Sequence, residues 1–190
     1  MKIIPMRTTW AVWLLAVVFP AAAHAQGPSF SVQAAAGPTI VETGYTVSVA
    51  GGFSPWSRVT FLLDVQRTQQ NSRITRSERD GVYSVSTFRG GTMTAVSGEV
   101  RVGLFPASRW TPYVLTGFGR GISHPTVNAD FPNAVENETR FVFFGAGVHV
   151  PVREHLSFFG DIRLLVGAEG THADGMMAMC PIRLGVAWRF

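Results

Sequence analysis

The sequence predicts an all-β protein: a cleaved signal peptide, then an eight-stranded antiparallel up-and-down β-barrel that crosses a membrane. Three observations favour this fold class. After residue 25, apolar residues recur at every second position in blocks of about ten residues, which Gly, Pro, Asn and Asp separate. The connections between the blocks alternate between short and long. Charged residues lie within the blocks, on the face opposite the large apolar side chains.

Residues 1–25 have the features of a signal peptide. Lys2 and Arg7 make the first residues basic, and the ten residues 10–19 are all apolar. Ala23 and Ala25 supply small residues at the two positions that a signal peptidase reads. Ten apolar residues are too few for a membrane-spanning helix, which needs about 20. We therefore expect a Sec-type signal peptide over residues 1–25 and a barrel domain over residues 26–190.

The composition argues against several other classes of protein. Without the two basic residues of the signal peptide, 14 arginines stand against 12 acidic residues, a net charge of 14 − 12 = +2. So small an excess does not indicate nucleic acid as a partner. Cys180 is the only cysteine, so we expect no disulfide framework. No stretch after residue 25 has 18 consecutive apolar residues, so no transmembrane helix is expected.

The first four predicted strands show a clear two-residue period. Successive side chains of a strand point to opposite faces, so this period gives each strand one apolar face. The strands and their apolar faces are 29–37 with Phe30, Val32 and Ala34; 44–53 with Tyr45, Val47 and Val49; 58–67 with Val59, Phe61, Leu63 and Val65; and 94–105 with Val96, Val100, Val102 and Leu104.

The last four predicted strands differ in how clearly their faces can be assigned. Residues 111–121 and 139–150 are apolar on both faces, so the register of these two strands stays open. The other two alternate clearly. They are 156–167 with Phe158, Ile162, Leu164 and Val166 on the apolar face, and 180–190 with Ile182, Leu184, Val186, Trp188 and Phe190.

The connections predict which end of the barrel faces which side of the membrane. The sequences "SPWS", "PASRW" and "PVREH" are short, and they join the second strand to the third, the fourth to the fifth and the sixth to the seventh. Most of the others are longer, at 68–90, 124–138 and 169–177, with a shorter one near 38–43. Short periplasmic turns opposite long external loops are typical of outer-membrane barrels.

Charged residues inside the strands indicate that the apolar face meets lipid. The interior of an eight-stranded barrel is just wide enough for side chains, so it cannot hold the large apolar residues of every strand. If a soluble barrel held the charges inside, its whole surface would be an apolar sheet. A bilayer removes this conflict, because the apolar face meets lipid and the charges pair in the lumen. The lumen residues are Asp64, Glu99, Arg101, Asp161, Arg163 and Arg183.

A membrane location also predicts closure and a girdle of aromatic residues. Hydrocarbon offers no partner to backbone N–H and C=O groups, so the eighth strand has to pair with the first. Tyrosine and tryptophan are enriched where a barrel meets the membrane surface. The candidates near strand ends are Tyr45, Trp56, Trp110, Tyr113 and Trp188.

With these features the chain resembles the small outer-membrane β-barrel proteins of the OmpA-type transmembrane domain and opacity-protein group. The local stretches that carry the resemblance are "WTPYVLTGFGRG", "FGAGVHVPVREHLSFFGDIRL" and "RLGVAWRF". The resemblance implies location in the cell outer membrane. It also implies that the barrel-assembly machinery reads the last strand as an assembly signal, through Leu184, Val186, Trp188 and Phe190.

The expected function is a structural or surface-interaction role: membrane integrity, adhesion, or host contact through the long loops. With three carboxylates and three guanidinium groups in the lumen, mutual pairing is expected to close it. The alternative is a narrow, porin-like channel or carrier for small solutes. An enzyme acting on envelope lipid comes third, because the sequence lacks the His-x-Ser spacing that a barrel deacylase would need: Ser123 and His124 are adjacent.

No cofactor or metal site is expected, because the histidines are too dispersed to form one. We expect a monomer whose partners are outer-membrane lipid and lipopolysaccharide. Guanidinium groups bind phosphate through two parallel hydrogen bonds, so arginines in the 68–90 connection are candidates for lipopolysaccharide contacts, unless this segment is simply a solvated loop. These candidates are Arg73, Arg76, Arg79 and Arg89.

Overall fold

The structure is a computed structural model, and it describes most of the predicted barrel. The described residues are 28–40, 43–71, 73–79, 82–88, 90–105, 110–126, 136–169 and 175–190; among them, residues 73–79, 82–88, 168–169 and 175–177 are described by their backbone alone. The predicted signal peptide, residues 1–25, lies outside the described residues. In the described part of the chain, no helix has the length and apolar character needed to cross a membrane.

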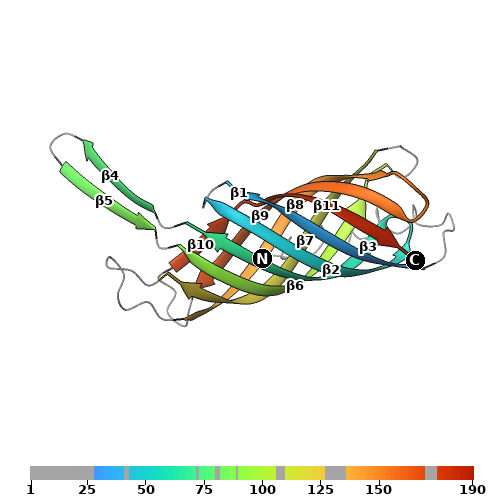
Figure 1. Cartoon of the computed structure of the whole chain (residues 1–190), viewed down its shortest axis with the longest axis horizontal. Coiled ribbons are helices and arrows are strands. Elements are labelled where there is room, and N and C mark those ends of the chain that lie inside the picture. The colour runs from blue at the N-terminus through green and yellow to red at the C-terminus, as the bar shows by residue number, and fades with distance from the viewer. Residues whose placement is uncertain are drawn as a thin grey trace, which may run out of the picture.

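The described residues form eleven strands, shown in Figure 1. In chain order they are β1 (Ser29–Thr39), β2 (Gly44–Trp56), β3 (Val59–Gln70), β4 (Arg73–Arg79), β5 (Val82–Phe88), β6 (Gly91–Gly103), β7 (Thr111–Pro125), β8 (Asn137–Pro151), β9 (Leu156–Glu169), β10 (Gly175–Met179) and β11 (Ile182–Arg189).

Nine of these strands form one antiparallel sheet that closes on itself. Its order is β10-β9-β11-β1-β2-β3-β6-β7-β8, and β8 also pairs with β9. Both β10 and β11 pair with β9, one after the other, so together they fill one position in an eight-stranded barrel. The predicted closure of the last strand against the first is present, because β11 pairs with β1 from Ala36–Leu184 to Ser31–Arg189. The predicted fold class is confirmed.

The break between β10 and β11 lies at Pro181, which has no N–H to donate to a sheet. The carbonyl groups around it remain paired. Cys180 O accepts a hydrogen bond from Ile40 N at 3.0 Å, and Pro181 O accepts one from Arg163 N at 3.1 Å. An isolated bridge also joins Thr39 to Pro181. The interruption therefore leaves the wall of the barrel continuous.

The connection predicted at 68–90 contains a second, two-stranded sheet. Strands β4 and β5 pair from Arg73–Phe88 to Arg79–Val82 and project beyond the end of the barrel (Figure 1). The segment is rich in residues with high β-propensity, and Asp80-Gly81, a dipeptide typical of tight hairpins, separates its two strands in the sequence. The sequence interpretation gave weight to the charges and treated this hairpin as a loop.

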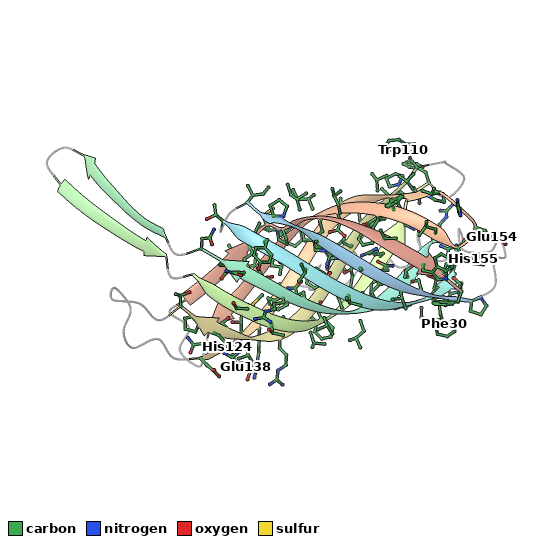
Figure 2. The ribbon with its side chains drawn as sticks, in the orientation of Figure 1. Phe30, Trp110, His124, Glu138, Glu154 and His155 are labelled. Atoms are coloured by element: carbon green, nitrogen blue, oxygen red, sulfur yellow. The ribbon has the colours of Figure 1, made fainter. Side chains whose placement is uncertain are left out.

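The two ends of the barrel differ as predicted. One end, called the turn end below, contains the short connections 57–58, 104–110 and 152–155; the other, the loop end, contains the longer ones. Figure 2 shows Phe30, Trp110 and His155 near the turn end and His124 and Glu138 near the loop end.

The outer surface of the barrel is an apolar band. Strand residues with the predicted outward parity are exposed and mainly apolar, for example Phe118 at 72% and Leu184 at 73%. Among the described barrel strands, outward charged residues occur only toward the loop end. They are Arg67, Arg120, Glu138 and Arg140.

The two strands of open register are now assigned. In β7, Tyr113 and Leu115 point inward, and in β8, Phe141 and Phe143 do so. Tyr113 was predicted in the aromatic girdle, and that assignment is wrong: the side chain is 4% exposed, and its hydroxyl hydrogen-bonds inside the lumen. Its parity, hidden by apolar residues on both faces of β7, directs it inward.

Inward aromatic rings lie opposite inward glycines. Each ring is the direct cross-strand partner of a glycine, and a Cβ added to that glycine would come closer than 3.0 Å to the ring. A narrow barrel can hold a large ring only where a neighbouring side chain is missing, so these glycines provide the space. The pairs are Tyr113–Gly147, Phe143–Gly117, Phe141–Gly119 and Phe159–Gly185.

We expect Gly119→Ala to destabilise the folded barrel by about 1–3 kcal/mol, because the new methyl group would overlap the Phe141 ring and Ser97 Cβ. The measurement is urea unfolding in detergent, followed by the gel mobility of folded and unfolded protein. The control is Gly51→Ala on β2, where a Cβ meets nothing within 4 Å, and there the change should stay within about 0.5 kcal/mol. Equal losses in both variants would contradict the packing argument.

Candidate functional site inside the barrel

All six charged residues predicted in the lumen lie inside the barrel and are buried. They come from four strands, and each has the inward parity of its strand. Arg183 is 1% exposed and Arg163 is 2% exposed, although arginine is almost never fully buried without a partner. We call this set the central charged network: Asp64 on β3, Glu99 and Arg101 on β6, Asp161 and Arg163 on β9, and Arg183 on β11.

Asp161 is the centre of this network. It is the direct cross-strand partner of Arg183. Arg183 donates from Nε to Asp161 Oδ1 at 3.0 Å and from Nη2 to Oδ2 at 3.0 Å, a two-pronged contact. Arg163 Nε donates to Oδ1 at 3.1 Å, and Tyr113 Oη donates to Oδ2 at 3.2 Å. One carboxylate therefore accepts hydrogen bonds from two guanidinium groups and one phenol.

Two further ion pairs cross the lumen. Arg163 Nη2 lies 2.7 Å from Glu99 Oε2, although β8 and β7 separate strands β9 and β6 in the sheet. Arg183 Nη1 lies 2.8 Å from Asp64 Oδ2, although β1 and β2 separate β11 from β3. These contacts connect opposite walls, so the network occupies the interior rather than lining one side.

Arg101 lies at the edge of the network nearest the turn end. Its Nε is 2.5 Å from Glu99 Oε1, and its Nη1 donates to Gln33 Oε1 at 2.9 Å. Its guanidinium carbon is 5.0 Å from the centre of the Tyr113 ring and 4.9 Å from that of the Phe159 ring. Aromatic rings attract a cation at such distances. Arg101 is therefore held by a carboxylate, an amide and two rings.

The charges balance within the network. Three guanidinium groups face three carboxylates, a net charge of 3 − 3 = 0. Burying an ion is costly unless good geometry and further hydrogen bonds compensate for the lost hydration. Here Ser48 accepts from Arg183 Nη1 at 3.0 Å, and the Gln33 and Tyr113 contacts add to this. The arrangement stabilises charge and presents no exposed reactive group.

On either side of the network the interior changes character. Toward the loop end it is filled by an apolar cluster, and toward the turn end it opens into a cavity of about 730 Å³. The cluster consists of Met93, Ala95, Tyr113, Leu115, Phe141, Phe143, Leu165 and Met179.

The other predicted site residues lie elsewhere. The last strand exposes its predicted apolar face on the outside of the barrel. Arg73, Arg76 and Arg79 belong to β4, of which the backbone is described, and Arg89 lies outside the described residues. The outward residues of the last strand are Leu184, Val186, Trp188 and Phe190.

Sequence reasoning missed three polar partners of the network: Gln33, Ser48 and Tyr113. Gln33 and Ser48 were assigned to the polar faces of their strands, so their inward parity was available as a signal. Tyr113 offered no such signal, because both faces of its strand are apolar.

The histidines do not gather in one place. His124 Nδ1 is 2.8 Å from Glu136 Oε1 near the loop end, whereas His149 and His155 line the turn-end cavity. Within the described ranges, no group of three or more His, Cys, Asp or Glu side chains has the arrangement of a metal site.

Comparison with solved structures finds the same fold. Neisserial surface protein A aligns with a TM-score of 0.65 at 14% identity, over 87% of this chain and 100% of that one. The N-terminal β-barrel domain of Pseudomonas aeruginosa OprF aligns with a TM-score of 0.54 at 16% identity, over 85% and 97%. Ail, the attachment invasion locus protein of Yersinia pestis, in complex with the heparin analogue sucrose octasulfate, aligns with a TM-score of 0.53 at 12% identity, over 87% and 100%.

No protein-family model matches the sequence, and no curated protein does so. At these low identities the structural alignments establish the fold: a small eight-stranded β-barrel of the kind found in outer-membrane proteins. The resemblance to small outer-membrane barrels, expected from the sequence, is confirmed at this level.

We expect Asp161→Asn to destabilise the folded barrel by about 3–5 kcal/mol, because it leaves Arg163 and Arg183 buried without their shared carboxylate. Urea unfolding in detergent measures this loss. The matched control is Glu138→Gln, which removes a carboxylate that also contacts two arginines but is 41% exposed. A surface pair contributes less than about 1 kcal/mol. Similar losses in both variants would show that burial of the network does not matter.

Proposed function

We propose that this chain is an integral outer-membrane protein, that the central charged network closes its lumen, and that it acts structurally or through contacts at the loop end. The observation that supports closure is the pairing across the lumen. Arg163 reaches Glu99 and Arg183 reaches Asp64 from opposite walls. An eight-stranded barrel is narrow enough for such side chains to fill its cross-section.

The outer surface supports the membrane location. Soluble monomers rarely expose apolar patches larger than a few hundred Å². Here large apolar side chains are exposed on β1, β2, β3, β6, β7, β8, β9 and β11, around the whole barrel. The outward charges of the described barrel strands lie toward the loop end, where a band facing hydrocarbon would end. The fold is also that of proteins from the outer membrane.

The loop end supports a role in surface contact. The hairpin of β4 and β5 extends beyond the barrel there (Figure 1), and β4 contains Arg73, Arg76 and Arg79. One structural neighbour is named for attachment and invasion and was solved with a polysulfated ligand. We propose that in this chain the hairpin contacts anionic groups at the cell surface, with lipopolysaccharide as the first candidate.

The last strand supports assembly into the membrane. Trp188 and Phe190 are exposed on the apolar outer face, while the backbone of β11 is paired on both sides by β1 and β9. We propose that the barrel-assembly machinery reads this face through Leu184, Val186, Trp188 and Phe190. We also propose that the closed barrel is monomeric, because closure leaves no barrel strand edge for a second copy to extend.

We expect the protein to be silent in planar lipid bilayers. The double variant Glu99→Ala/Arg163→Ala should instead show stepwise ion conductance, because it removes a buried ion pair that crosses the lumen. The control is Glu138→Ala/Arg140→Ala, which removes a pair of the same chemistry on the outside, with Arg140 Nε 3.2 Å from Glu138 Oε1. Steps of equal size in the wild-type protein and the control would refute closure and favour the alternative, a narrow channel for small solutes.

We expect the hairpin arginines to bind lipopolysaccharide phosphates. Changing Arg73, Arg76 and Arg79 together to Gln should weaken binding of purified lipopolysaccharide about tenfold, because each exposed ionic contact contributes a few tenths of a kcal/mol to 1 kcal/mol. Titration at two salt concentrations measures this, and the variant should depend less on salt. The control changes Thr75, Ser77 and Ser84 to Gln on the same hairpin, without loss of charge. Equal affinity in all three proteins would leave the hairpin as a solvated extension.

A further inference from the structure

The turn-end cavity is a built space that the central charged network does not use. Its volume of about 730 Å³ lies within the range of small-molecule binding pockets, about 300–1,000 Å³. Every strand position of the barrel contributes to its lining. Its inner end is formed by Arg101 and Tyr113 at the edge of the network, so the cavity opens at the turn end and is blocked beyond it.

The walls of the cavity carry hydroxyl groups at several heights and on several strands. Hydroxyl groups donate hydrogen bonds and can rotate to suit a ligand. They belong to Ser31, Ser54, Ser57, Thr60, Thr111 and Ser157. Such a lining offers donors from many directions, which suits a ligand with several oxygen acceptors.

The cavity has an excess of positive charge. Arg58, Arg101, Arg153 and Arg189 line it, and the acidic residue in its lining is Glu154. Arg101 is already paired with Glu99, so the remaining balance is 3 − 1 = +2 with the histidines neutral. A concave site with one sign of charge concentrates counter-ions. The cavity is therefore suited to an anion.

Two of these arginines are positioned for binding. In the part of the chain that the structure describes, the buried Nε of Arg58 has no hydrogen-bond partner. The backbone of Arg189 is fixed by His155 on both sides: Arg189 N donates to His155 O at 2.8 Å, and His155 Nδ1 donates to Arg189 O at 3.0 Å. His155 is held in turn against the Trp188 ring, with 5.9 Å between ring centres. Figure 2 shows His155 and Glu154 at this end of the barrel.

We propose that the turn-end cavity is a binding site for a small phosphate-bearing solute. Arginine binds phosphate through two parallel hydrogen bonds, and the site offers Arg58, Arg153 and Arg189 to one anion. A doubly charged tetrahedral group accepts hydrogen bonds from several directions, which matches hydroxyl donors around the wall better than a planar carboxylate does. The proposal rests on the proposed function only because the closed network forms the inner end of the cavity.

The test is isothermal titration calorimetry of the folded full chain in an uncharged maltoside detergent, with pyrophosphate as the probe. We expect saturable binding that weakens as salt rises. Arg58→Gln/Arg189→Gln should weaken it at least tenfold. Arg140→Gln, an exposed arginine on the outer face toward the loop end, is the control with the same kind of charge change and should bind like the wild-type protein.

Several outcomes would overturn the proposal. They are absence of binding, an equal loss in the Arg140→Gln control, or succinate binding as tightly as pyrophosphate, which would replace the phosphate assignment by general attraction for anions. If the double variant fails to show the gel mobility of the folded barrel, Arg153→Gln at the exposed rim takes its place, with at least a threefold loss expected. Because the titration is done in detergent, its failure is distinguishable from a failure of lumen closure, which conductance tests.

Discussion

Backbone pairing is the constraint on which the rest of this barrel depends. Hydrocarbon cannot satisfy N–H and C=O groups, so a sheet inside a membrane has to close. Closure here is made by β11 against β1 and by β9 against β8, and β9 continues to pair across the break at Pro181. With only eight strand positions, closure also fixes a narrow interior. The contents of the lumen follow from that width.

The lumen is filled by a mixture of large and missing side chains. Inward rings such as Phe143 and Phe159 fit because their direct partners, Gly117 and Gly185, have no side chain. These rings are also binding partners for the charges: the guanidinium carbon of Arg163 lies 5.2 Å from the centre of the Phe143 ring. Packing and electrostatics are therefore satisfied by the same residues. Beyond the network toward the turn end, smaller hydroxyl-bearing residues leave the cavity open.

Much of this could be predicted from the sequence because a strand has a period of two and a membrane makes one face apolar. The six lumen charges were found this way, since each interrupts a run of apolar neighbours. Parity cannot say which residues meet across the lumen: Arg163 and Glu99 are 64 positions apart, and their contact depends on the closed sheet. Tyr113 was misplaced because both faces of β7 are apolar, and β4 and β5 were overlooked because their charges resemble those of a solvated loop.

The central charged network also explains why each strand keeps its register. Buried ion pairs are weak contributors to net stability, because desolvation offsets much of the attraction. Their effect on alternatives is larger. A shift of one residue would turn every side chain of a strand to the opposite face. For β9 it would direct Asp161 and Arg163 toward lipid, where an arginine at the midplane costs about 2–4 kcal/mol, and would strip Arg183 of its partner. The network thus acts mainly by making wrong pairings unfavourable, and an apolar interior of the same volume would lack that effect.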